Sequence, residues 1–233
     1  MTPANGPDQN ADTPELRERR HAMMLEVAEM AEAVHPEAGA ARISEQVLAA
    51  LGRVPRHRFV PQYLRLHAYD NRPLPIGHDQ TISQPYIVGL MTELLALQPG
   101  ARVLEVGTGS GYQAAVLAEM GAAVWSVEIV DALAKQAAET LAAEGYDKVQ
   151  VRAGDGYAGW PEQAPFDGII VTAGAAHVPP PLLDQLKPGG RLVIPVGEPY
   201  QVQQLWLIEK SGDGRSHRQR VTDVRFVPLT GGH

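Results

Sequence analysis

A glycine-rich turn is the part of this 233-residue sequence best suited to bind a ligand. The apolar run Arg102–Val106 predicts a buried strand, and Tyr112–Met120 predicts the helix that follows it. Between them stand Gly107, Gly109 and Gly111, where a backbone without Cβ atoms can turn sharply and let a ligand come close. The first N–H groups of the helix point into the same space, so we expect a ligand at the C-terminal end of this strand.

The spacing of the three glycines indicates which class of ligand the turn could bind. The third glycine comes one residue too early for a dinucleotide fingerprint, and the Gly-Lys-Ser/Thr ending of a P-loop is absent. The pattern Glu-x-Gly-x-Gly-x-Gly resembles the S-adenosylmethionine sites of Rossmann-like methyltransferases, whose ligand has no pyrophosphate. In that resemblance Glu105 engages the cationic amino-acid part of the ligand, and Val106 and Thr108 border it.

Two further acids follow the next strand candidates. Glu128 ends the second strand, where a carboxylate can accept both hydroxyls of a ribose, although a strand-end charge can also simply face solvent. Asp155, between Gly154 and Gly156, could accept from an adenine amino group, although Asp-Gly is also common in turns. Because the carboxyl ends of parallel strands meet at one edge, we expect these residues to converge on one crevice.

The elements that must position these residues alternate along the chain. We expect strands at residues 102–106, 123–128, 149–152, 168–171 and 191–196, and helices at 112–120, 131–144 and 181–186. This alternation predicts an α/β fold with a doubly wound, mostly parallel sheet and helices on both faces. Residues 203–209 and 221–227 flank a polar turn at 211–218, which indicates an antiparallel edge at the C-terminal side of the sheet.

The N-terminal third of the chain has a different texture. Residues 1–13 read as a disordered tail, and helices are expected at 14–34 and 44–51. Prolines then interrupt residues 52–85, so we expect residues 14–85 to form a helical extension and a lid over substrate and cofactor. Residues 86–233 form the ligand-binding core and make one compact unit with the extension. Three arginines at 53, 56 and 58 are interpreted as solvated charges beside a helix end.

Composition excludes several functions. The chain has no cysteine, so disulfides, thiolate metal sites and cysteine nucleophiles are excluded. The formal charge of -7 disfavours nucleic-acid partners, and the histidines show no metal-binding pattern, so we predict no metal. The sequence has no run of 18 or more apolar residues, so we expect no membrane span. We expect a cytoplasmic monomer.

Several segments together resemble the protein-L-isoaspartate O-methyltransferase family, over roughly residues 42–230. They are Pro73–Gly77, Gln80–Tyr86, Leu104–Gln113, Ala164–Asp167, Leu186–Gly190 and Val224–Leu229. The Thr-Ile-Ser-x-Pro motif at Thr81 is specific to that family, whereas the glycine turn is shared by many methyltransferases. The resemblance implies transfer of a methyl group from S-adenosylmethionine to the α-carboxylate of L-isoaspartyl residues in damaged proteins and peptides. The resulting ester then collapses to a succinimide.

The resemblance also implies roles for individual residues. Ser83 matches the active-site serine, and Thr81 and Ile82 lie with it against the cofactor. The other matching cofactor positions are Glu105, Val106, Gly107, Thr108, Gly109, Glu128, Asp155, Gly156 and Thr230. A carboxylate is already ionised at neutral pH, so its methylation needs positioning rather than a strong base.

Other interpretations stay open. Ser83 could cap the helix that begins near Tyr86. The fold could serve a methyltransferase for a dedicated peptide, a non-catalytic cofactor-binding module or a nicotinamide-dependent dehydrogenase, although the glycine spacing argues against the last. The pair His78-Asp79 and Gly174 depart from the common family pattern, which leaves the detailed substrate preference open.

Overall fold

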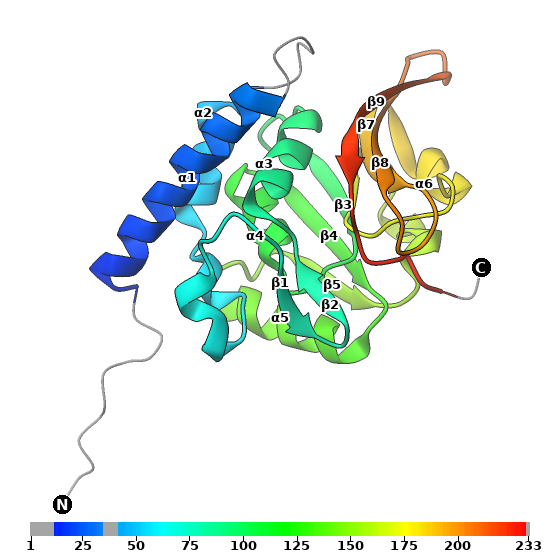
Figure 1. Cartoon of the computed structure of the whole chain (residues 1–233). Helices are drawn as coiled ribbons and strands as arrows, with labels where there is room; N and C mark the ends of the chain where they lie inside the picture. The colour runs from blue at the N-terminus through cyan, green and yellow to red at the C-terminus, as the bar shows by residue number, and fades with distance from the viewer. Residues whose placement is uncertain (1–11, 35–41, 232–233) are drawn as a thin grey trace, which may run out of the picture.

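The protein has an α/β fold built around one large sheet, and a computed structural model describes its residues 12–34 and 42–231 (Figure 1). A seven-stranded sheet runs through the centre, and a two-stranded hairpin stands beside it. Within the described ranges, no helix is both long and apolar enough to cross a membrane.

The helices and strands follow the chain in this order. The N-terminal part contains α1 (Pro14–Val34), α2 (Glu45–Arg53), the 3-10 turns η1 (Arg56–Arg58) and η2 (Gln62–His67), β1 (Leu74–Gly77), β2 (Gln80–Ile82) and α3 (Pro85–Leu94). The central part contains β3 (Arg102–Val106), α4 (Tyr112–Glu119), β4 (Ala123–Glu128), α5 (Asp131–Ala143), β5 (Gln150–Ala153), η3 (Gly156–Ala158) and η4 (Pro161–Gln163). The C-terminal part contains β6 (Phe166–Val171), α6 (Pro180–Gln185), β7 (Leu186–Val196), β8 (Gln203–Lys210) and β9 (Ser216–Val224).

The sheet has the strand order β5-β4-β3-β6-β7-β8-β9. Strands β3 to β7 are parallel to one another, and β8 and β9 add an antiparallel edge beside β7, which confirms the predicted mostly parallel sheet. The crossovers run outward in opposite directions from β3 and β6, so a crevice opens beyond the ends of these two strands. The order of the last two strands, which the sequence leaves open, is simply sequential.

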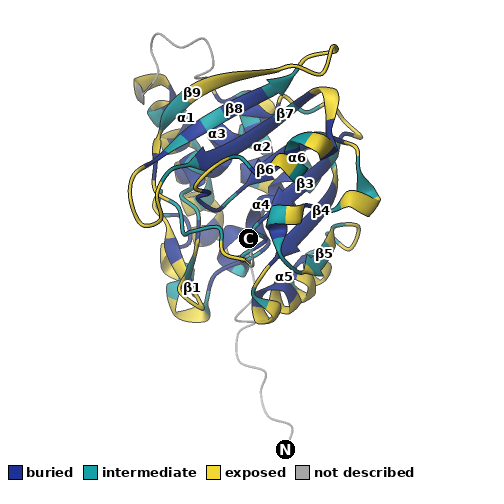
Figure 2. Cartoon of the chain, turned by 90° about the vertical axis from the view of Figure 1, so that its right-hand side faces the viewer, coloured by how far each residue is buried: buried dark blue, intermediate teal, exposed yellow. Residues whose placement is uncertain are grey.

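Helices cover both faces of the sheet, as predicted (Figures 1 and 2). Helices α1 to α5 pack on one face around Val103, Val124 and Ile170. Helix α6 and the neighbouring loops pack on the other face around Leu104, Trp125 and other buried side chains. Strand residues therefore alternate between two apolar cores. The parallel strands β3 and β6 are buried almost throughout, as Figure 2 shows, and β7 is buried at residues 192–195.

The proline-rich segment contains regular structure that the sequence analysis did not predict. Strands β1 and β2 pair antiparallel, and His78 and Asp79 form the tip of the hairpin with φ values of 53° and 57°. These left-handed conformations suit a tight hairpin turn and favour glycine or asparagine, so the departure at His78-Asp79 concerns the turn. Both residues are exposed and lie outside the walls of the cleft described below.

Two expected boundaries at the C-terminal edge were wrong. Strand β9 begins at Ser216, well before the predicted start at residue 221, because the polar residues 216–220 pair with the apolar strand β8. Strand β7 begins at Leu186, which was predicted as the last residue of a helix, and not at the predicted residue 191. An edge strand needs no apolar alternation on its exposed side, which explains why the pattern missed the first five residues of β9.

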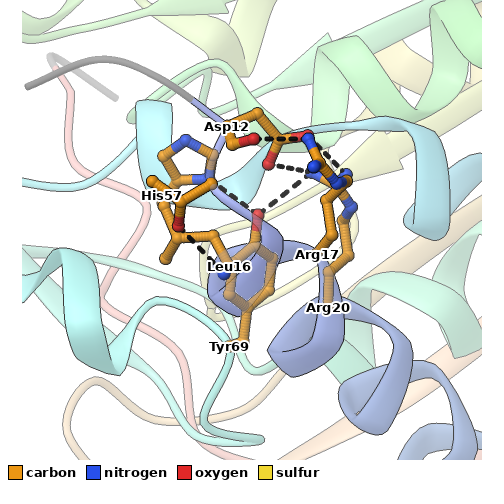
Figure 3. A network of polar contacts seen from close by, with 7 residues as sticks. Asp12, Leu16, Arg17, Arg20, His57 and Tyr69 are labelled. Carbon is orange, nitrogen blue, oxygen red and sulfur yellow. Dashed lines mark hydrogen bonds and ion pairs between the residues drawn. The ribbon is translucent and has the colours of Figure 1, made fainter. Parts of the chain in front are cut away.

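A polar network fixes helix α1 to the segment that follows α2 (Figure 3). Asp12 forms an ion pair with Arg20 at 2.9 Å, and Arg20 Nη1 lies 3.3 Å from the hydroxyl of Tyr69. That hydroxyl also lies 2.7 Å from Nδ1 of His57, which is 1% exposed. Because guanidinium can only donate, the hydroxyl accepts from Arg20, and the tautomer of His57 sets the direction of the second hydrogen bond. Burial lowers the pKa of His57 to about 4, so the imidazole is neutral at pH 7.

The change Tyr69→Phe should lower the free energy of unfolding by about 1–2 kcal/mol, because it leaves Nδ1 of the buried His57 without a hydrogen bond and removes one of the hydrogen bonds of Arg20. Urea denaturation measures this loss. The change Tyr63→Phe is the matched control, since Tyr63 is 75% exposed. Equal stability of the two variants would contradict a role for the Tyr69 hydroxyl.

Candidate functional site

A cleft opens at the C-terminal ends of β3, β4 and β6, where the crossovers change direction. It is open to solvent, and the space between its walls, open solvent included, is about 750 Å³. Its walls come from the end of the hairpin, the glycine turn, the ends of the strands and the segment 227–230. Most of the predicted site residues line it, namely Thr81, Ile82, Ser83, Val106, Gly107, Thr108, Gly109, Glu128, Gly156 and Thr230. The tertiary structure therefore brings together residues that are far apart in the sequence.

The glycine turn has the backbone geometry that the sequence predicts. Gly107 and Gly109 have φ values of 97° and 53°, which favour glycine. A Cβ atom at Gly107 would lie 2.4 Å from the hydroxyl of Thr172. That hydroxyl donates to the carbonyl of Gly107 at 2.6 Å, so a side chain from the end of β6 braces the turn against the neighbouring strand. The floor of the cleft is therefore rigid backbone rather than side chain.

Glu128 ends β4 beside this turn. Its Oε2 accepts a hydrogen bond from the backbone N–H of Gly109 at 2.8 Å, and its Oε1 accepts from Val130 at 3.0 Å. The residue is 5% exposed and still lines the cleft. A carboxylate held by two backbone donors keeps its direction and has lone pairs left for ligand hydroxyls.

Glu105 lies one layer beneath the cleft and does not line it. Its side chain is fully buried, and Oε2 accepts from the hydroxyl of Ser126, which lies 2.5 Å from the hydroxyl of Thr108. Oε1 has no hydrogen-bond partner among the described residues. Burial raises the pKa of Glu105 to about 8, so the carboxyl group is mostly protonated at pH 7. Glu105 therefore reaches the cleft only through Ser126 and Thr108, because alternation along β3 turns it to the opposite face from Val106.

Asp155 also stands just outside the cleft wall. Its side chain caps η3 by accepting from the N–H of Tyr157 at 2.9 Å, and Gly231 packs directly against the carboxylate. The adjacent Gly156 lines the cleft, and a Cβ atom there would lie 2.4 Å from the side chain of Val106. The C-terminal segment thus closes this end of the cleft, with Thr230 in its wall.

Ser83 lies in the wall between this cleft and a second cavity. The interpretation of Ser83 as a helix cap is wrong, since α3 begins at Pro85 and its N-cap residue, Gln84, makes no side-chain capping bond. The second cavity is open to solvent, measures about 950 Å³ with that open solvent included, and is bordered by Ile87, Val202 and the segment Asp223–Val227. Thr81, Ser83 and Thr172 line both cavities. These three hydroxyl side chains therefore mark where the two spaces meet.

Some residues of the site escaped the sequence analysis. Thr172 directly follows β6, so its place at a strand end was a signal that could have found it. Arg56 gave no such signal. It was grouped with exposed charges, but it is 0% exposed, whereas Arg53 and Arg58 form ion pairs with Glu119 and Glu144. Chain folding, rather than local pattern, buries Arg56.

Other polar candidates lie at the rim. His177 is exposed, and its Nε2 lies 3.0 Å from the hydroxyl of Tyr157. In the described part of the chain, no group of three or more His, Asp or Glu residues could hold a metal ion.

The sheet order, the glycine turn and the acid at the end of β4 define the class of Rossmann-like methyltransferases. Comparison with known proteins narrows this class. A model of the family "Protein-L-isoaspartate(D-aspartate) O-methyltransferase (PCMT)" matches residues 30–233. The chain belongs to this family.

Similar proteins agree with this assignment. The chain is 58% identical over 214 residues to protein-L-isoaspartate O-methyltransferase 2 of Syntrophobacter fumaroxidans, with 92% of this chain and 87% of the relative covered. It is 56% identical over 209 residues to a protein of the same name from Polaromonas sp., covering 90% and 99% of the two chains.

Solved structures show the same fold. A structure named protein-L-isoaspartate O-methyltransferase has a TM-score of 0.80 at 29% identity, covering 91% of this chain and 66% of that chain. A Plasmodium falciparum protein described as belonging to the same family, in complex with S-adenosyl-L-homocysteine, has a TM-score of 0.74 at 25% identity. It is covered over 98% of its length, against 91% of this chain.

The change Glu105→Gln should remove a pH dependence of stability. The folded state binds the Glu105 proton up to about pH 8 and the unfolded state only up to about pH 4.5, so the free energy of unfolding falls as pH rises between these values. The slope is at most about 1.4 kcal/mol per pH unit. Urea denaturation is measured at pH 5 and pH 8. Relative to the parent, the free energy of unfolding of the variant should be about 1–3 kcal/mol higher at pH 8 than at pH 5.

The matched control is Glu29→Gln, because Glu29 is exposed on α1. An equal pH dependence in the parent and in Glu105→Gln would show that Glu105 does not carry the effect.

Proposed function

We propose that this protein transfers a methyl group from S-adenosylmethionine to the α-carboxylate of L-isoaspartyl residues in damaged proteins and peptides. The single observation that carries the proposal is the position of Ser83 between a glycine-cradled cleft and a second cavity. One cavity suits a nucleoside-like cofactor, and the other suits an acceptor side chain. Family membership and the names of the similar proteins support the same activity.

The residues of the cleft fit the cofactor. At Gly107 and Gly109 the cleft is lined by backbone without Cβ atoms, and the Glu128 carboxylate stands where ribose hydroxyls need an acceptor. Gly156 with the nearby Asp155 would border the adenine, and Thr230 would cover it from the C-terminal segment. The complex of a similar structure with S-adenosyl-L-homocysteine supports this choice of cofactor.

The remaining site residues would contact the amino-acid end of the cofactor. Thr81 and Ile82 face the glycine turn across the cleft, and Val106 and Thr108 continue its floor. Glu105 would act through Ser126 and Thr108. A protonated carboxyl group there can lose its proton when a cation binds nearby, because a neighbouring positive charge lowers a carboxyl pKa.

The chemistry asks little of the protein beyond positioning. S-adenosylmethionine, when bound, supplies an electrophilic methyl group. The acceptor carboxylate is ionised at neutral pH, so no base has to remove a proton. Ser83 can donate a hydrogen bond from its hydroxyl to one carboxylate oxygen and so direct the other toward the cofactor, with Thr81 and Thr172 beside it. The methyl ester then forms a succinimide without the enzyme, and hydrolysis of this ring returns some normal aspartate.

The experiment that tests the function compares two peptides that differ in one linkage, isoaspartyl or normal aspartyl. The purified protein is incubated with methyl-labelled S-adenosylmethionine, and base-labile methyl esters are counted. We expect esters on the isoaspartyl peptide alone. Cofactor binding without transfer to either peptide would contradict the repair function and favour an enzyme for a dedicated peptide or a non-catalytic module.

The change Ser83→Ala serves as the site-specific arm of this experiment. We expect cofactor binding within about threefold of the parent and a turnover at least about tenfold lower, since one positioning hydrogen bond is lost. Ser211→Ala, in the exposed turn between β8 and β9, is the control. Unchanged turnover in Ser83→Ala would remove Ser83 from the mechanism.

The change Glu128→Gln should weaken binding of S-adenosyl-L-homocysteine by about 10- to 100-fold, because hydrogen bonds to a charged group contribute about 1.5–3 kcal/mol. Isothermal titration calorimetry measures the affinity. Glu139→Gln, on the exposed side of α5, is the control. An affinity of Glu128→Gln within twofold of the parent would argue against the ribose contact.

The proposal extends to partners and location. We also propose a monomeric enzyme that binds isoaspartyl proteins and peptides, and the formal charge of -7 supports an enzyme without a nucleic-acid partner. Analytical ultracentrifugation would test the monomer. We also propose a cytoplasmic location, which cell fractionation would test.

A further inference from the structure

Arg56 is a buried guanidinium group that has no acidic partner among the described residues. It is 0% exposed, and no carboxylate among the described residues lies within ion-pair distance. Burial lowers its pKa only to about 10, so the group stays charged at neutral pH. Burying a charge without a counter-charge is unfavourable, so its hydrogen bonds and ring contact must offset a large cost.

The contacts of Arg56 join three separate segments. Nε donates to the carbonyl of Ala68 at 2.8 Å, and Nη2 donates to the carbonyl of Ser83 at 2.8 Å. The guanidinium carbon lies 4.8 Å from the ring centroid of Tyr112, the residue that directly follows the glycine turn. One side chain thus connects the backbone of Ser83 with the turn that forms the floor of the cleft.

Hydrogen bonds of neighbouring residues fix the segments that carry Arg56 and Ser83. The next residue, His57, reaches in another direction to Tyr69, which holds Arg20 of α1 (Figure 3). On the other side of Ser83, the side chain of Asn71 accepts from the N–H of Tyr86 at 3.0 Å. The short segment around Ser83 is therefore fixed from two sides, and its hydroxyl makes no capping bond that would turn it away from the cavities.

We propose that Arg56 is a positioning residue that acts through Ser83, holding its backbone so that the hydroxyl stays at the junction of the two cavities. This inference rests on the proposed function. Methyl transfer depends on alignment, and a displacement of about 1 Å can lower a rate about 100-fold. Lysine cannot replace arginine here, because an ammonium group lacks the planar fork that reaches two carbonyls while stacking on a ring.

The test measures turnover with the isoaspartyl peptide in Arg56→Lys and Arg56→Met. Arg56→Met also removes the buried charge, so it keeps the test available if Arg56→Lys does not fold. The control is Arg58→Lys, because Arg58 lies in the same 3-10 turn but pairs with Glu144 at the C-terminal end of α5. Affinity for S-adenosyl-L-homocysteine and the unfolding temperature are measured for every variant.

We expect kcat of the folded Arg56 variants to fall about 10- to 100-fold, with KM and cofactor affinity within threefold of the parent. Arg58→Lys should keep kcat within twofold. In a Ser83→Ala background, Arg56→Lys should lower kcat by less than threefold, because the hydroxyl that it positions is already absent.

Three results would overturn the inference. A kcat within twofold of the parent, measured per folded molecule, would make Arg56 a purely structural residue. An undiminished effect in the Ser83→Ala background would show that Arg56 acts by another route. A parent protein that methylates neither peptide would overturn the proposed function and this inference together, a result distinct from an active parent with equally active Arg56 variants.

Discussion

The pairing of β3 with both β4 and β6 is the constraint from which the site follows. Val106 pairs with Val127 on one side and with Val171 on the other, so the three strands end at the same level. The glycine turn, Glu128 and Thr172 stand directly beyond these ends and therefore meet. Because the chain leaves β3 and β6 in opposite directions, no crossover fills the space between them. A cleft is then a consequence of topology, and side chains decide only what it can bind.

Buried ionisable groups around this cleft meet the low polarity of the interior in different ways. Glu105 becomes neutral by keeping its proton, and His57 becomes neutral by losing one. Arg56 does neither, because its pKa of about 10 still lies well above neutral pH. Its charge is instead stabilised by hydrogen bonds to two carbonyl groups and by contact with an aromatic ring. The retained charge is the exception among the three, and it contacts the backbone of the residue that we assign to the acceptor.

The N-terminal extension contributes to the site rather than merely covering the sheet. Helix α1 holds Tyr69 through Arg20, and the same part of the chain carries Arg56 and the β1–β2 hairpin. The hairpin returns the chain so that Thr81 and Ser83 face the glycine turn. Prolines between residues 52 and 85 prevent long helices and strands, and side-chain hydrogen bonds to carbonyls hold this segment instead. The acceptor side of the site is therefore built from contacts that are distant in sequence.

Local sequence patterns were sufficient to predict the parallel sheet, the glycine turn and the acid at the end of β4. Strand periodicity, glycines at positive φ and strand-end position are local properties that survive folding unchanged. The same patterns could not reveal that Glu105 is turned away from the cleft, that Arg56 is buried or that β9 begins at Ser216. Each of these depends on which segment packs opposite the residue, and burial, pKa and partner are properties of that packing. The residue types thus predicted which chemistry the site could do. Contacts between segments distant in sequence determine which side chains lie in the cleft.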